Sequence, residues 1–158
     1  MNLTDIREIQ ALLERHKFRF SYFMGQNFLT ASWVPEDIAA SAMLDENVGV
    51  VEVGPGIGCL TNELSKLAGK VLSVELDKSL RPILAETLKG RDNVEIFFGD
   101  VMKQDLRALA EEKLGPGRKV VCANLPYNIT SPVLTAFLEA GCFDSITVMI
   151  QREVARRI

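Results

Sequence analysis

Short apolar runs alternate with helical patterns along most of this chain, and this alternation restricts the fold more than any other feature. The runs are rich in β-branched residues and bounded by Gly, Asp or Asn, as buried strands are. They cover residues 48–53, 70–75, 94–98, 119–123 and 145–150. Strands and helices in alternation predict a parallel sheet with helices on both faces. We therefore expect an α/β, Rossmann-like fold with about five parallel strands.

Composition fits one domain over residues 1–158, since 47% of the residues are hydrophobic, 25% are charged, and no linker or repeat interrupts the chain. Three scattered cysteines and one histidine predict a reducing compartment and no metal site. The charged start and the lack of a long apolar run predict a cytoplasmic protein without a membrane segment. The net charge of −3 argues weakly against nucleic acid, yet both ends of the chain are basic.

A glycine-rich turn follows the first expected strand, with Gly54, Gly56 and Gly58 directly before a helical pattern. Glycines let the backbone approach a ligand, and a helix start offers free N–H groups. Glu75 ends the second expected strand, where an acidic side chain can accept hydrogen bonds from both ribose hydroxyls. The sequence therefore predicts a nucleoside-containing cofactor, although a tight turn can use glycines for structural reasons alone.

The details of the turn favour S-adenosylmethionine over NAD. The third glycine comes one residue earlier than in the dinucleotide fingerprint. Glu52, two residues before the turn, would repel a pyrophosphate but suits a sulfonium or ammonium group. Asp100 ends the third strand and could accept a hydrogen bond from an adenine amino group, while Val101 offers a backbone N–H. Asp100 could equally serve only as a helix N-cap.

The fourth strand ends in Asn124, Leu125, Pro126 and Tyr127. The proline fixes an extended turn, which leaves the Asn124 side chain and the Leu125 carbonyl free to accept hydrogen bonds from an exocyclic amine. The ring of Tyr127 can stack on a base. We interpret this turn as a catalytic site for methylation of a planar amine, in which catalysis rests on orientation. A simple structural turn is the alternative.

Two helix starts carry capping signals. Asp5 with Glu8 predicts a capping box for a first helix. Ser131 followed by Pro132 predicts an N-cap and a first-turn proline.

Together these motifs resemble the ribosomal RNA adenine N6-dimethyltransferase family, over about residues 16–158. The resemblance rests on the sequence Gly-Gln-Asn-Phe-Leu at 25–29, the turn at 52–58, Glu75, Asp100, and Asn-Leu-Pro-Tyr at 124–127 with its continuation to Pro132. It points to the small-subunit branch. It implies a class I methyltransferase fold and N6,N6-dimethylation of two adjacent adenosines near the 3′ end of small-subunit rRNA, during ribosome biogenesis.

The resemblance also implies roles for individual residues. Cofactor contacts would come from Gln26, Asn27, Leu29, Gly54, Glu75, Asp100 and Asn124. The residue types around the glycine turn and Asp100 add Glu52, Gly56 and Val101. Residues 1–34 would form an amino-terminal helix and a lid segment over the cofactor. The partner would be small-subunit rRNA or the immature small subunit, with no obligate protein partner.

Two features depart from the family pattern. Aromatic residues crowd positions 18–33, where they either pack a lid onto the core or stack on RNA bases. The resemblance further implies two more strands and a helical domain after residue 158, so we expect a truncated chain that binds cofactor but transfers methyl groups poorly. Two other functions stay open: methylation of another planar amine by the same fold, and a non-catalytic role in ribosome assembly.

Overall fold

The computed structural model describes residues 1–18, 33–125 and 129–150, and its centre is one five-stranded parallel sheet in the order β3-β2-β1-β4-β5. The strands are β1 (Gly49–Val53), β2 (Lys70–Glu75), β3 (Val94–Phe98), β4 (Lys119–Asn124) and β5 (Ser145–Met149). The helices are α1 (Ile6–Arg15), α2 (Trp33–Ser41), α3 (Cys59–Leu67), α4 (Arg81–Thr87), α5 (Leu106–Leu114) and α6 (Thr130–Ala140). Short 3-10 turns, η2 (Lys78–Leu80) and η3 (Val101–Lys103), follow β2 and β3. The expected parallel α/β fold is confirmed, with strand ends shifted by at most one residue.

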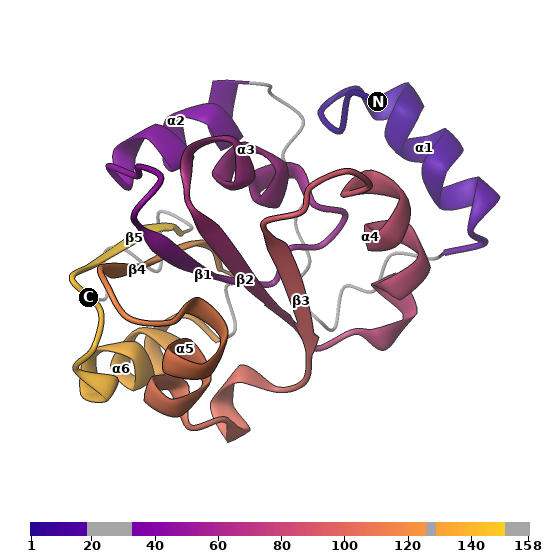
Figure 1. Cartoon of the computed structure of the whole chain (residues 1–158). Coiled ribbons are helices and arrows are strands. Elements are labelled where there is room, and N and C mark those ends of the chain that lie inside the picture. The colour runs from indigo at the N-terminus through magenta and orange to yellow at the C-terminus, as the bar shows by residue number, and fades with distance from the viewer. Residues whose placement is uncertain (19–32, 126–128, 151–158) are drawn as a thin grey trace.

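Helices cover both faces of the sheet, with α2 and α3 on one side and α5 and α6 on the other (Figure 1). The central strands β1, β2 and β4 are buried on both faces, so successive residues of one strand enter different cores, whereas the edge strands β3 and β5 are partly buried. Val51 and Val53 of β1 belong to the cluster under α5 and α6. Val50 belongs to the cluster under α2 and α3. Near-continuous apolar strands are therefore what this architecture requires.

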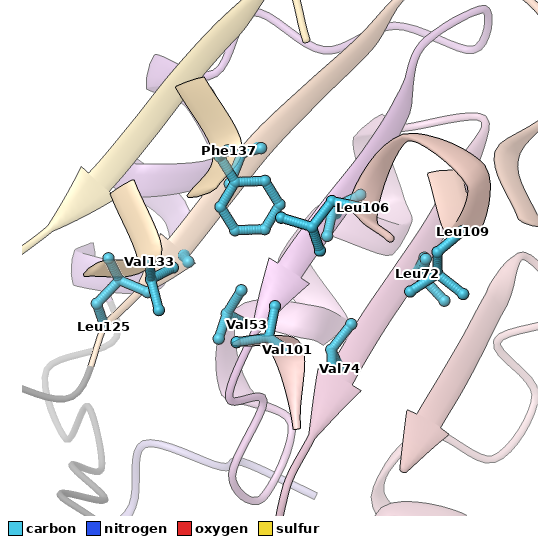
Figure 2. Packing of buried hydrophobic residues seen from close by; sticks show 12 residues of the cluster. Val53, Leu72, Val74, Val101, Leu106, Leu109, Leu125, Val133 and Phe137 are labelled. Atoms are coloured by element: carbon cyan, nitrogen blue, oxygen red, sulfur yellow. The ribbon is translucent and has the colours of Figure 1, made fainter. Parts of the chain in front are cut away.

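The core between the sheet and the helices α5 and α6 is built around Phe137, which is almost fully buried. Figure 2 shows Phe137 of α6 opposite Leu106 of α5, with Val133 and Leu125 beside each other near the end of β4. The ring of Phe137 also meets that of Phe143 edge to face, with the ring centroids 5.3 Å apart. These contacts hold α6 against the sheet.

The amino-terminal helix α1 packs against α4 and the glycine turn. Its buried residues Ile9 and Leu12 share a cluster with Ile57, which lies inside the turn. Arg15 extends this contact at the surface through an ion pair with Glu86, at 2.7 Å. The helix thus supports the turn from behind.

Capping differs from the sequence expectation at two helices. Asp5 caps α1 as expected, by accepting from the N–H of Arg7, but Glu8 accepts from the N–H of Asn2 instead of completing a capping box. The N-cap prediction for α6 was wrong: the helix begins at Thr130, so Ser131 lies inside it and Ile129 is the N-cap, although Pro132 does lie in the first turn as expected. The helix therefore starts two residues earlier than the Ser131 signal indicated, at Thr130, which is buried.

The chain reverses its direction of travel across the sheet between β1 and β4, which are neighbours in the sheet but not in sequence. In open parallel sheets, ligands bind at such a switch point, outside the carboxyl ends of the strands. Among the described residues, none of the helices has the length and apolar character needed to cross a membrane.

Candidate cofactor and substrate site

The carboxyl ends of β1, β2, β3 and β4 meet at one edge of the sheet, because all four strands run parallel. This edge carries the glycine turn after β1, Glu75 at the end of β2, Asp100 after β3, and Asn124 at the end of β4. Among the residues that the structure describes, these predicted site residues therefore lie at one edge of the sheet.

The glycine turn uses backbone conformations that favour glycine. Gly54, Gly56 and Gly58 have φ angles of 69°, 58° and 97°, all in the left-handed region. The N–H of Gly54 donates to the carbonyl of Val74 at 2.9 Å, which ties the turn to β2. Gly58 is the N-cap residue of α3 and provides no side chain to cap it. The helix start therefore faces the edge with backbone groups alone, as an anion or polar ligand site requires.

Glu75 joins the end of β2 to this turn. Its Oε1 accepts from the N–H of Gly56 at 3.2 Å, and its Oε2 accepts from the N–H of Asp77 at 2.9 Å. Only 4% of the residue is exposed, and burial raises the pKa of its carboxyl although both N–H groups act in the opposite direction. Each oxygen keeps a second lone pair. A fixed carboxylate of this kind can accept hydrogen bonds from two neighbouring hydroxyl groups.

Glu52 lies inside the molecule, with 1% of its surface exposed. Its Oε1 accepts hydrogen bonds from the hydroxyl of Thr61 on α3 and from that of Ser73 on β2, the latter at 2.7 Å. Burial raises the pKa of the Glu52 carboxyl to about 7; the two hydroxyl groups lower it and the nearby Glu75 raises it further. Glu52 therefore lies behind the turn, enclosed between α3 and β2.

Asp100 acts as an N-cap, the structural role that the sequence left open. Its Oδ1 accepts from the N–H of Met102 at 2.9 Å at the start of η3. Its second oxygen makes no hydrogen bond to the part of the chain that the structure describes. The side chain of Val101 is buried in the core shown in Figure 2, so only its backbone is available to a ligand.

Asn124 ends β4 beside Met149 of β5 and is partly exposed. The next residue, Leu125, buries its side chain in the core, and its N–H donates to the carbonyl of Met149 at 3.3 Å. This anchoring fixes the backbone position from which the Asn124 side chain projects at the sheet edge. The other predicted site residues, Gln26, Asn27, Leu29, Pro126 and Tyr127, lie outside the described residues.

The sequence reasoning missed four residues of this edge. Ser73 and Thr61 are the partners of Glu52, and the signal for Ser73 was a hydroxyl within an otherwise apolar strand. Leu76 and Met102 follow Glu75 and Val101 and are 55% and 44% exposed. Exposed apolar side chains beside a row of polar groups suit the faces of an aromatic ring.

The strand order, the glycine turn and the acidic residues after β2 and β3 define a Rossmann-like fold of the class I methyltransferase type. A sequence model of the family "Ribosomal RNA adenine dimethylase" matches residues 15–158. The chain therefore belongs to the ribosomal RNA adenine dimethylase family, as its motifs predicted.

Two curated relatives show how far the similarity extends. The chain is 45% identical over 151 residues to a ribosomal RNA small subunit methyltransferase A of Ligilactobacillus salivarius, covering 94% of this chain and 51% of that protein. It is 44% identical over 160 residues to the protein of the same name from Streptococcus gordonii, covering 100% and 55%. The chain spans about half the length of the curated relatives it matches.

Solved structures agree with this assignment. The crystal structure of the 23S rRNA methyltransferase ErmE matches with a TM-score of 0.71 and 34% identity, over 82% of this chain and 50% of that one. A dimethyladenosine transferase from Plasmodium falciparum matches with a TM-score of 0.64 and 28% identity, over 79% and 43%.

Proposed function

We propose that this chain binds S-adenosylmethionine and that the protein dimethylates N6 of two adjacent adenosines near the 3′ end of small-subunit rRNA. The observation that carries the proposal is the Glu75 carboxylate, held by the N–H of Gly56 at the carboxyl edge of the sheet. It offers a ribose two fixed acceptor oxygens beside a glycine turn. Identity of 44–45% to proteins named for the small subunit supports the choice of substrate.

The residues at the edge fit this cofactor. Glu75 would hold the ribose, Asp100 and the backbone of Val101 the adenine, and the glycine turn with Gly54 and Gly56 the amino-acid part. Leu76 and Met102 provide exposed apolar surface for the adenine ring. Glu52 supplies negative charge behind the turn, where a sulfonium group would gain from it. Gln26, Asn27 and Leu29 complete the proposed contacts.

When bound, the cofactor supplies an electrophilic methyl group. The chain itself orients the amine: the Asn124 side chain and the Leu125 carbonyl accept the two N6 hydrogens of adenine, which directs the nitrogen lone pair. Pro126 would fix the turn and Tyr127 would stack on the base; both lie outside the described residues. Catalysis thus rests on orientation and on hydrogen bonds to the amine as its acidity increases.

The proposed partner is the immature small ribosomal subunit, and we accordingly place the protein in the cytoplasm. Residues 1–158 would act as the cofactor-binding catalytic domain, with residues 1–34 as its helix and lid.

The test separates cofactor binding from methyl transfer. Calorimetric titration with S-adenosylmethionine and with NAD should give binding heat with the first only. Transfer of labelled methyl groups to unmethylated small subunits should be lost in Asn124→Ala, while cofactor affinity changes less. Heat with NAD alone would refute the cofactor assignment. Unchanged methylation by Asn124→Ala would refute the proposed role of Asn124 and favour an assembly role.

A further inference from the structure

The edge strand β3 presents backbone groups on the outer side of the sheet. Asn93 and Gly99 flank this strand and both bond to β2, with backbone N to O distances of 2.8 and 2.9 Å. Backbone groups alternate between the two sides of a strand, so those of Ile96 and Phe98 face away from β2. The N–H and carbonyl groups of these two residues make no hydrogen bond within the part of the chain that the structure describes. The outer side of β3 therefore offers donors and acceptors in alternation.

A groove of about 270 Å³ lies between β3 and the helix α4. Figure 1 shows α4 alongside β3, and their side chains share one apolar cluster. The groove is lined by Val94, Ile96 and Phe98 from the strand and by Leu84 and Leu88 from the helix. Proteins bind extended peptides at such edges, where the strand backbone supplies hydrogen bonds and the groove takes alternate side chains.

Arginines lie at the two ends of this groove. Arg81 begins α4, and its guanidinium carbon lies 4.2 Å from the centre of the Phe98 ring, at the carboxyl end of β3. Arg91 lines the groove near the amino end of the strand. Neither arginine forms an ion pair among the described residues; Glu86 of α4 pairs instead with Arg15. The groove therefore suits an occupant that is apolar in its middle and carries a carboxylate at each end.

β3 has none of the features that usually protect an edge strand from pairing. Residues 94–98 include no proline and no lysine, and their unbroken register with β2 leaves no bulge. The one charged residue among them, Glu95, pairs with Lys113 of α5 at 3.0 Å, on the opposite face of the sheet from α4. The edge is therefore open to another strand.

We propose that β3 and α4 form a docking site for an extended peptide segment of another protein, with apolar side chains at alternate positions and an acidic residue at each end. The segment adds a strand beside β3. Its backbone bonds to Ile96 and Phe98, its apolar side chains enter the groove, and its two carboxylates meet Arg81 and Arg91. The contact is transient in kind, because a single short strand buries little surface.

Two other occupants fit these groups less well. A nucleic acid strand would place phosphates against the outward carbonyl groups of Ile96 and Phe98, which repel them. A second copy of the chain would pair β3 with β3 in antiparallel fashion, which brings the arginines at the ends of the two strands together. An acidic peptide meets neither obstacle.

A synthetic peptide tests the site. The probe is fluorescein-labelled Glu-Val-Thr-Val-Thr-Val-Glu amide, titrated with the protein and followed by fluorescence anisotropy. Binding should be saturable below about 1 mM, and a peptide with lysine at both ends should bind about tenfold more weakly. No binding at that concentration, or equal binding of the two peptides, would overturn the inference.

A proline substitution tests the backbone contact. Ile96→Pro removes an outward N–H but no bond to β2, so an edge strand tolerates it. It should weaken binding of the probe about tenfold, through the lost hydrogen bond and the added ring. Ile96→Val keeps the N–H and is the matched control, which should bind within about twofold of the unaltered protein. Urea unfolding shows whether each variant is folded, and equal binding by folded Ile96→Pro and Ile96→Val would contradict strand addition.

Charge reversal provides a second route if Ile96→Pro does not fold. Arg81→Glu and Arg91→Glu should each weaken the acidic probe about fivefold and strengthen the lysine-ended peptide. Arg118→Glu makes the same change in net charge outside the groove, where this side chain reaches the carbonyl of Met43; it should alter neither affinity. Equal effects of all three substitutions would show that net charge alone attracts the probe, and would overturn the site.

Amide hydrogen exchange locates the bound peptide. Binding should slow exchange at the outward N–H groups of Ile96 and Phe98, whereas those of Glu95 and Phe97 face β2 and should change little. Binding without this protection would place the peptide elsewhere and refute the proposal. Protection of the same two amides by single-stranded RNA but not by the peptide, or by dimerisation of the protein alone, would replace the peptide with one of the other two occupants.

Discussion

The carboxylate of Glu75 on β2 accepts a hydrogen bond at 3.2 Å from the backbone N–H of Gly56, which lies in the turn after β1. Its other oxygen accepts from the N–H of Asp77 at 2.9 Å. Two neighbouring loops of the sheet edge are therefore held by one side chain. The same oxygens retain lone pairs toward the edge, so the residue can organise the site and bind a ligand at once.

Glu75→Ala should therefore weaken binding of S-adenosylmethionine by about a hundredfold or more, because two hydrogen bonds to a charged group are lost and each contributes about 1.5–3 kcal/mol. Isothermal calorimetry measures the change, and urea unfolding shows whether the variant remains folded. Glu95→Ala is the matched control on β3 and should bind normally. Normal cofactor affinity in a folded Glu75→Ala protein would contradict the assignment.

Glycine at position 58 is required for two separable reasons. Its φ of 97° disfavours any side chain, and an added Cβ would lie 3.0 Å from the hydroxyl of Thr87 and 3.2 Å from Leu88. Gly90 has a φ of 85° with nothing within 4 Å of an added Cβ. Both alanine substitutions should lower the free energy of unfolding by about 1 kcal/mol through backbone strain, and Gly58→Ala by a further ~1 kcal/mol through crowding.

Urea unfolding of both variants measures this difference. An equal loss of stability in the two proteins would show that Thr87 and Leu88 adjust to the added methyl group, so that the left-handed backbone alone explains the glycine at position 58.

The contact of α1 with the glycine turn predicts that the amino-terminal helix contributes to the stability of the whole domain. Leu12 is fully buried, and Leu12→Ala should reduce the free energy of unfolding by about 2–5 kcal/mol, through lost burial and the cavity that remains. Ile6 lies on the same helix and is 58% exposed, so Ile6→Ala should change stability by less than about 1 kcal/mol. Chemical denaturation compares the two, and similar losses would mean that α1 is not docked as described.

Burial of Glu52 also predicts a pH dependence of stability. Burial raises the pKa of Glu52 from its ordinary value of 4.5 to about 7 in the folded protein, so the native state keeps a proton that the unfolded chain has lost. The stabilisation is complete below pH 4.5 and disappears as the pH rises toward 7, by about 3 kcal/mol in total. Glu52→Gln should lack this contribution.

The measurement is urea unfolding of both proteins at pH 5 and at pH 7.5, with the difference between the proteins taken at each pH so that other titrating groups cancel. A difference that does not change with pH would mean that Glu52 ionises at an ordinary pKa.

Much of the fold could be read from local patterns. Alternating apolar runs and helical spacing predicted all five strands, since burial of both sheet faces requires near-continuous apolar residues. The wrong start of α6 shows where this fails: Ser131 and Pro132 carry a capping signal, but the helix begins at Thr130, whose side chain is buried. Burial depends on what the rest of the chain places there.

The sequence by itself determined the fold class, the family and the residues at the sheet edge, because these depend on periodicity and on residue types at fixed spacings. The tertiary structure alone decided that Glu52 is enclosed by Thr61 and Ser73, and that α1 supports the turn through Leu12 and Ile57. Both arrangements join segments far apart in the chain. Such contacts leave no periodic signal, since each side chain acquires its partner, its burial and its pKa only when the chain folds.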